Sequence, residues 1–165
     1  MSESGCLRNE SVESLNVTGI ISGARRPVKL LVDKAAASAH DAITAAESGT
    51  IFLVPALGTA GAQTISLPAC ANSIGCYYTF ISIATVGKDL DVITPASELI
   101  LAVTADGAGN NSGISAGKNS IGFDENALFG ASFTVTCISA TPGIAWLAHD
   151  VIDSLEANVG GINLK

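Results

Sequence analysis

The sequence predicts an all-β fold: a single compact β-sandwich or β-barrel-like domain with an extended N-terminal arm. Short runs of alternating apolar and polar residues recur along the chain, with Gly, Pro, Asn or Ser turn signals about every 8–12 residues. The 165 residues are enough for one domain of ordinary size. The alanine-rich stretch 34–46 is interrupted by His40-Asp41 and by the β-branched pair Ile43-Thr44, so we expect at most one helical turn there.

The expected strands are short and rich in β-branched and aromatic residues. In chain order they lie at 15–21, 28–33, 50–54, 63–67, 77–85, 99–104, 133–138 and 144–148. The alternation is clearest in 63–67, where Ile65 and Leu67 lie on one face and Thr64 and Ser66 on the other.

The strand at 77–85 is apolar on both faces. Tyr77, Ile81 and Ile83 lie on one face, and Tyr78 and Phe80 lie on the other. A strand with two apolar faces belongs in a closed core or at a contact between subunits. We therefore expect both faces of this strand to be covered.

Composition divides the chain into three parts. Residues 1–26 are the predicted N-terminal arm, 27–157 the β domain, and 158–165 a C-terminal tail able to extend onto a neighbouring subunit. Within the domain, 105–122 is rich in glycine and poor in apolar residues. We expect a flexible loop there.

The charge balance argues against a nucleic-acid partner. Eight basic and fifteen acidic residues give a formal net charge of −7, whereas nucleic-acid phosphates require a basic surface. Only 14% of the residues are charged, which favours a surface covered by other subunits over a soluble monomer. The chain lacks an apolar run of the roughly 20 residues that a membrane helix needs, and its first residues lack the apolar core of a secretory signal. We expect a protein made in a cytoplasm, with no membrane partner.

No residue pattern points to a metal or a cofactor. The cysteines are Cys6, Cys70, Cys76 and Cys137. They form no C-x-x-C pair, so no zinc site is expected, and Cys76 and Cys137 are expected to be buried structural residues. The acidic pairs Asp89/Asp91 and Asp124/Glu125 are interpreted as solvated loop residues.

Catalysis is not expected either. His40 and His149 are each followed by an aspartate, but the chain has no G-x-S-x-G nucleophile motif. We interpret His149-Asp150 as a turn at the end of a strand. The alternative, a Ser-His-Asp triad assembled in space, requires an exposed His149 beside a serine. The sequence thus predicts a protein that is not an enzyme.

Two sets of residues are candidates for docking and for packing. Arg25 and Arg26 are predicted to bind carboxylates of a partner, because arginine forms two parallel hydrogen bonds with a carboxylate. The alternative is that they only solvate a turn. Ile144, Trp146 and Ala148 share one face of the last strand, so Trp146 is predicted to be a core anchor rather than a platform for a glycan.

Several segments occur in an order that resembles small β proteins of tailed-phage virions. These segments are Ile43-Thr-Ala-Ala-Glu-Ser-Gly49 followed by Thr50-Ile-Phe-Leu-Val54, Gln63-Thr-Ile-Ser-Leu-Pro-Ala69, Cys76-Tyr-Tyr-Thr-Phe80 and Pro142-Gly-Ile-Ala-Trp-Leu-Ala148. They are similar to the family phrases T-a-a-d-S-G-k-x-F, v-T-L-P-a, an aromatic strand, and G-x-x-W-x-v. The likeness covers residues 43–85 and 130–150. Cys70, Cys76 and the longer glycine-rich loop depart from the pattern.

The family resembled comprises capsid decoration (cement) proteins and related head-associated proteins. The resemblance implies a virion structural protein on the capsid surface that binds the major capsid protein lattice, stabilises the head and forms a homotrimer. Residues 15–21 are also similar to fibre-type repeats. They support an alternative, a tail fibre or head-spike domain that binds a host surface receptor or glycan.

Overall fold

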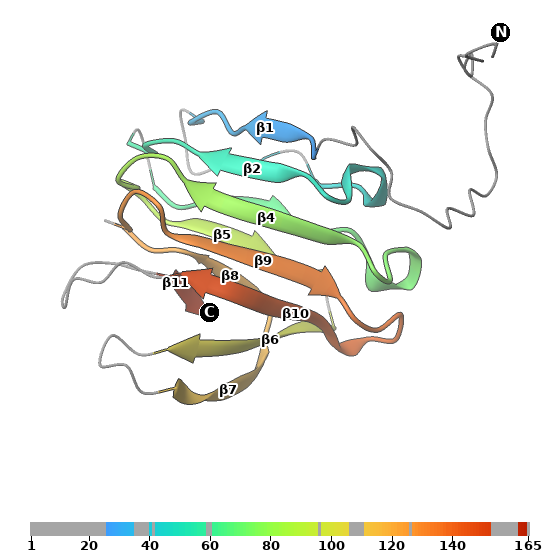
Figure 1. Cartoon of the computed structure of the whole chain (residues 1–165). Coiled ribbons are helices and arrows are strands. Elements are labelled where there is room, and N and C mark those ends of the chain that lie inside the picture. The colour runs from blue at the N-terminus through green and yellow to red at the C-terminus, as the bar shows by residue number, and fades with distance from the viewer. Residues whose placement is uncertain are drawn as a thin grey trace, which may run out of the picture.

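The computed structural model describes residues 26–34, 40, 42–58, 61–95, 97–105, 111–125, 127–152 and 162–164. They form two β-sheets packed against each other (Figure 1). The predicted all-β sandwich is therefore confirmed. Most of the predicted arm, residues 1–25, lies outside the described residues.

The larger sheet has seven strands in the order β1-β2-β4-β9-β10-β6-β7. Their bounds are β1 Val28–Leu30, β2 Ile51–Val54, β4 Tyr77–Ser82, β6 Glu98–Ala105, β7 Asn111–Lys118, β9 Ser132–Cys137 and β10 Gly143–Ile152. The pairs β1–β2, β2–β4 and β6–β10 are parallel, and the other three are antiparallel. Strands β9 and β10 come late in the chain yet lie in the middle of the sheet (Figure 1).

The smaller sheet has four strands in the order β11-β8-β5-β3. Their bounds are β3 Gln63–Ser66, β5 Leu90–Ile93, β8 Ser120–Phe123 and β11 Ile162–Leu164. Strands β3 and β5 are parallel, while β8 is antiparallel to both β5 and β11. Two short 3-10 helices, Ala45–Glu47 and Cys70–Asn72, precede β2 and β4.

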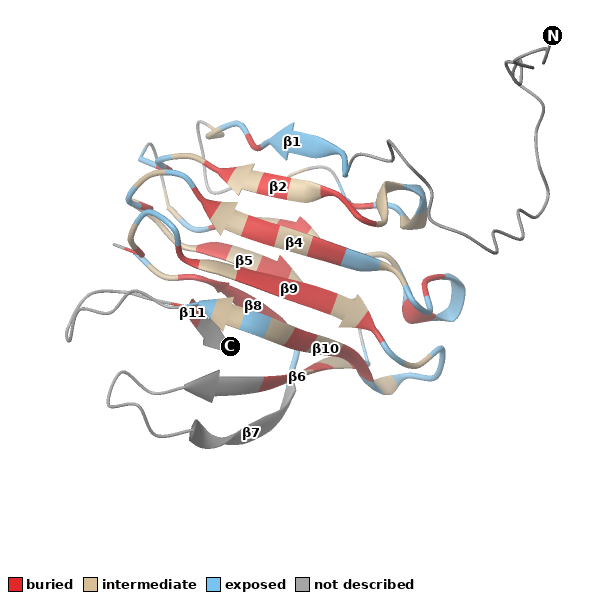
Figure 2. Ribbon diagram, in the orientation of Figure 1, coloured by how far each residue is buried: buried red, intermediate tan, exposed pale blue. Residues whose placement is uncertain are grey.

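Aromatic rings form the centre of the core. Phe52, Phe80 and Phe133 lie on the neighbouring strands β2, β4 and β9, and each adjacent pair stacks with ring centroids 5.1 Å apart. Phe123 of the smaller sheet contacts Phe133 at 5.1 Å and so joins the two sheets. All four rings are completely buried, and Figure 2 shows alternating buried and half-buried residues along β4 and a longer buried stretch in β9.

The Thr-Ala-Ala-Glu segment forms the turn that leads into β2. The Glu47 carboxylate accepts hydrogen bonds from the N–H (2.9 Å) and the hydroxyl (3.0 Å) of Thr44. The bond from the Thr44 N–H lowers the pKa of Glu47, with partial burial acting against it. Lys29 of β1 forms an ion pair with the same carboxylate at 3.2 Å. The turn thus ties the start of β2 to β1.

The expected strands from 28–33 to 144–148 are all present, as β1, β2, β3, β4, β6, β9 and β10. In β3 and just beyond it, the predicted alternation is confirmed, since Ile65 and Leu67 are buried and the residues between are half-buried. The expected strand at 15–21 lies outside the described residues. Strands β5, β7, β8 and β11 were not expected from the sequence.

Two predicted irregular regions contain strands. The loop prediction for 105–122 is wrong for β7, which pairs with β6, and for β8, which pairs with β5; residues 106–110 lie outside the described part. In the tail 158–165, Ile162–Leu164 pairs with β8 of the same chain instead of extending onto a neighbour, and the rest is not described. Both regions are therefore partly integrated into the sandwich.

A bulge changes the predicted faces of β10. The register with β6 shifts between Ile144 and Trp146. Ile144 consequently points outward with 44% of its surface exposed, whereas Ala145 and Trp146 are both completely buried. The prediction that Ile144 shares a face with Trp146 is therefore wrong.

Candidate interaction surface

The outer face of the larger sheet is where the described strands are least covered. In β4, Tyr78 and Phe80 point into the core and are completely buried. On the opposite side, Tyr77 is 39% exposed, and Ile83 just after the strand is 36% exposed. Within a single chain, therefore, only one of the two apolar faces of this strand is fully covered.

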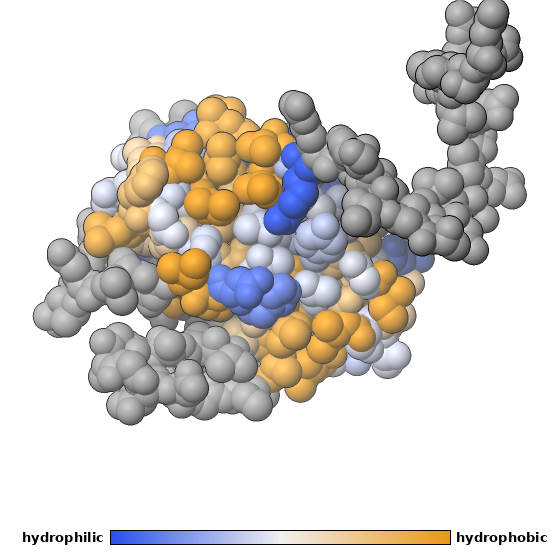
Figure 3. All heavy atoms as spheres, viewed as in Figure 1, coloured by the Kyte–Doolittle hydropathy of each residue, from blue (hydrophilic) through white to orange (hydrophobic). Residues whose placement is uncertain are grey.

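Six aliphatic side chains form an apolar area over β1, β2 and β4, which we call the aliphatic patch. Its members are Val28, Leu30, Ile51, Leu53, Ile81 and Ile83. The strand register aligns Val28 with Ile51, and Leu30 with Leu53 and Ile81. Val28 and Leu30 are 61% and 57% exposed. Figure 3 shows hydrophobic atoms gathered over this part of the sheet.

Next to the patch runs a polar band made of Thr79, Thr134, Thr136 and His149. The hydroxyls of Thr79 and Thr134 are hydrogen-bonded at 3.0 Å, and His149 Nε2 is hydrogen-bonded to Thr136 Oγ1 at 2.9 Å. His149 Nδ1 lies 2.9 Å from Asp150 Oδ2. These bonds hold the side chains in place before any partner binds, which reduces the entropy lost on binding.

A second apolar area lies beyond the polar band, on β10 and β6. The register aligns Ile144 with Leu99, and Leu147 with Leu101. Ile144 is exposed and the three leucines are half-buried. The outer face thus carries two apolar areas separated by fixed polar groups, a combination typical of protein–protein contacts.

Arg26 is held against the same face. Its Nε donates to Gly49 O at 2.9 Å, its Nη2 donates to Thr79 Oγ1 at 2.8 Å, and its guanidinium lies 5.2 Å from the centre of the Tyr77 ring. Arg26 therefore contacts the β domain rather than extending as part of an arm, and two of its nitrogens already bind the protein's own groups. Arg25, its predicted partner in docking, lies outside the described residues.

The interpretation of His149-Asp150 as a turn at a strand end is wrong, because both residues lie within β10. The order Thr136–His149–Asp150 resembles the nucleophile, base and acid of a hydrolase triad, with threonine in place of serine. Strand β9 is paired on both sides, however, and the N–H of Cys137 donates to Cys76 O at 2.8 Å. The backbone beside Thr136 is thus committed to the sheet, whereas an oxyanion hole needs free donors. The cluster is better suited to binding than to catalysis.

Trp146 lies inside the core, away from this surface. Its Nε1 donates to Glu98 Oε2 at 2.9 Å, and the N–H of Cys70 donates to Glu98 Oε1 at 2.9 Å. Glu98 is only 5% exposed, so these bonds compensate for removing its carboxylate from water. A completely buried Trp146 cannot serve as a platform for a glycan.

The two acidic pairs meet at one end of β5 and β8, where Leu90 is aligned with Phe123. Asp91 lies in β5, not in a loop as predicted. Asp89 Oδ1 accepts a hydrogen bond from the Glu125 N–H at 2.7 Å, and the Glu125 carboxylate pairs with Lys88 at 3.1 Å. In the described part of the chain, no group of three or more His, Cys, Asp or Glu residues is placed to hold a metal ion.

Cys70 and Cys137 are buried free thiols, and burial raises the pKa of each. Cys76 was also predicted to be buried, but it is only half-buried. We expect iodoacetamide at about pH 8 to leave both unmodified in the folded protein, because the thiolate is the reactive form. Peptide mass spectrometry should find both modified after unfolding in urea. Equal modification rates with and without urea would contradict their structural role.

Polar band residues Thr79, Thr134 and Thr136 were missed by the sequence analysis. Their only sequence signal is alternation with buried residues in two strand patterns.

No helix in the described ranges is long and apolar enough to cross a bilayer. No protein-family model and no curated protein sequence matches the chain.

Proposed function

We propose that this is a non-catalytic structural protein that docks onto a larger assembly through the outer face of its seven-stranded sheet. The proposal is carried by the aliphatic patch, the polar band and the second apolar area, which share one sheet face. Apolar contacts would supply most of the binding free energy, and the fixed polar groups would set the orientation of the partner. The paired backbone around Thr136 supports a binding role over a catalytic one.

The assembly we propose is a virion, with the protein as a capsid decoration protein on the lattice of the major capsid protein. The support is the resemblance of 43–85 and 130–150 to that family, together with the ordered elements that these residues form. A decoration protein repeats one contact at every lattice site, which calls for a rigid body. Closed symmetry multiplies that contact, so we propose a homotrimer whose subunits contact one another through the aliphatic patch.

The first test replaces Leu30 and Ile83 together by glutamate. Both side chains are exposed members of the aliphatic patch, so the domain should stay folded while the charges oppose burial at an interface. Light scattering should give a trimer for the parent protein and a monomer for the variant at tens of micromolar. Ile74→Glu is the matched control, because Ile74 is 65% exposed but is not part of the patch. A monomeric parent protein, or a variant that associates like the parent, would contradict the proposal.

The second test measures how many copies a virion contains. Mass spectrometry of purified particles should count on the order of hundreds of copies if the protein decorates the capsid lattice. A count of a few to a few tens would instead indicate a tail fibre or head spike. Absence from purified particles would contradict the virion assignment. The docking face would then be tested only by the light-scattering comparison of the Leu30, Ile83 double variant with the parent protein.

A further inference from the structure

Strand β1 is an apolar edge with an open side. Among the described residues it pairs only with β2. Val28, Leu30 and Val32, in and just after the strand, are 61%, 57% and 69% exposed. An exposed apolar edge strand is a template for pairing with another strand, and native proteins usually cover or charge such an edge.

The backbone of β1 shows which groups point to the open side. Pro27 O accepts a hydrogen bond from Ile51 N at 2.8 Å, and Leu31 N donates to Leu53 O at 2.9 Å. In a parallel pair, alternate residues face the neighbouring strand. The N–H groups of Leu30 and its alternating neighbours therefore point away from β2, toward the open side.

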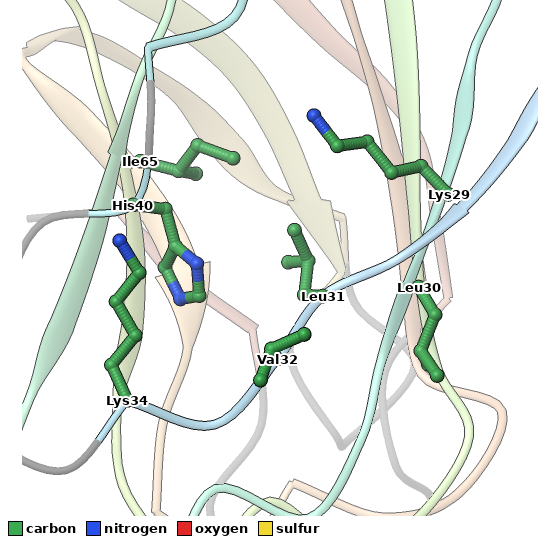
Figure 4. Close-up of a pocket in the computed structure, with 7 residues that line it drawn as sticks. All are labelled: Lys29, Leu30, Leu31, Val32, Lys34, His40 and Ile65. Atoms are coloured by element: carbon green, nitrogen blue, oxygen red, sulfur yellow. The ribbon is translucent and has the colours of Figure 1, made fainter.

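A pocket of about 140 Å³ lies beside this edge, between β1 and β3. Leu31 and Ile65 provide its apolar lining, and Lys29, Lys34 and His40 stand around it (Figure 4). The pocket is thus an unfilled part of the sandwich, where the edges of the two sheets meet.

The corresponding edge of the smaller sheet is already covered. His40 N donates to Thr64 O at 2.7 Å and Ile43 N donates to Ser66 O at 2.9 Å, so His40 and Ile43 lie alongside β3. The side chain of His40 is also held against this sheet, because its Nε2 is hydrogen-bonded to Oε1 of the buried Gln63 at 2.7 Å. Only the β1 side of this junction is left open in the described part of the chain.

We propose that residues 15–21 of the same chain pair with the open edge of β1 and form an eighth strand of the larger sheet. In the segment Leu15-Asn-Val-Thr-Gly-Ile-Ile21, the odd-numbered residues Leu15, Val17, Gly19 and Ile21 fall on one face, and Asn16, Thr18 and Ile20 fall on the other. The apolar face continues the buried side of the sheet and covers the pocket. The opposite face, which carries Ile20 besides Asn16 and Thr18, extends the outer surface.

The connection is suited to pairing within one chain. Residues 22–26 separate the segment from Pro27, and hairpin loops of about five residues are common. Gly23 supplies a residue that accepts positive φ in such a turn. Arg26, bound to Gly49 O, fixes the end of the turn at the start of β1. The short tether also gives the segment a local concentration of about millimolar at this edge, which favours it over other strands.

Amide hydrogen exchange measured by NMR on the full chain tests the pairing directly. The amide of Leu31 is an internal reference, because it is bonded to Leu53 O with or without an eighth strand. If the segment pairs with β1, the Leu30 and Val32 amides should exchange as slowly as that of Leu31. The full-length double variant Val17→Asp, Ile21→Asp should accelerate exchange at Leu30 and Val32 at least tenfold, with Leu31 unchanged. Asn16→Asp, with a charge on the opposite face, should keep the protection.

Three results would overturn the proposal. The first is fast exchange of Leu30 and Val32 in the parent protein. The second is full protection in the Val17→Asp, Ile21→Asp variant, which would mean that another segment covers the edge. The third comes from mixing the isotope-labelled double variant with unlabelled parent protein. If the Leu30 and Val32 amides of the variant become protected again, the segment that covers β1 is donated by a second copy. Without that restoration, the pairing is within one chain.

Discussion

Replacing Trp146 by alanine is expected to lower the free energy of unfolding by about 3–5 kcal/mol. The side chain is the largest of the completely buried residues, and its ring lies 6.2 Å from that of Tyr78. The substitution leaves a cavity and also removes one of the two hydrogen bonds to the buried Glu98 carboxylate. Urea unfolding followed by far-ultraviolet circular dichroism measures the loss.

Two further variants separate packing from hydrogen bonding at this position. Trp146→Phe keeps most of the apolar volume but removes the indole N–H, and we expect a loss of about 1–3 kcal/mol. Phe129→Ala is the surface control, since Phe129 is 74% exposed, and a change within about 0.5 kcal/mol is expected. A Trp146→Ala protein as stable as the parent would show that Trp146 is not a core anchor.

Gly122→Ala is expected to destabilise the domain by about 3 kcal/mol, the upper end of the usual range for overpacking. A Cβ atom at this position would overlap the carbonyl oxygen of Leu90 and lie 2.9 Å from the Cα of Asp91. Both obstacles are parts of the neighbouring strand β5, so relief requires β5 and β8 to move apart. Thermal and urea unfolding should both show the loss.

Gly58→Ala is the matched control for this substitution. A Cβ at Gly58 would meet nothing within 4 Å. Its stability should stay within about 0.5 kcal/mol of the parent. If Gly122→Ala were equally harmless, the close approach of β5 and β8 would not be a constraint on the fold.

The sequence predicts those strands in which side-chain type and alternation agree. In β4 and β9, β-branched and aromatic residues alternate with residues on the outer face, and both strands were expected. In β8, Gly122 permits the close approach of β5. A glycine in so short a segment is also typical of a loop, so local composition and tertiary packing disagree there. Strand β5 contains Asp91 between two apolar residues and is only four residues long, too short for a distinct pattern.

The interaction surface was less predictable, because it depends on which strands are neighbours. Thr79 and Thr134 are 55 residues apart in the chain, yet their hydroxyls are hydrogen-bonded across β4 and β9. Alternation indicates that each faces away from the core, but it does not give their pairing. The bulge in β10 is also not encoded in local alternation, and it moves Ile144 from the expected inner face to the outer one.

The late position of β9 and β10 in the chain has a consequence for how the protein is made. Strands β1, β2 and β4 lie on one side of them and β6 and β7 on the other, so the larger sheet cannot be joined before residues 132–152 leave the ribosome. Phe133, which contacts both sheets, arrives with the same segment. A nascent chain without it would hold two partial sheets with open edges, a state prone to aggregation. We therefore expect folding to finish after synthesis, at a rate limited by pairing between distant segments.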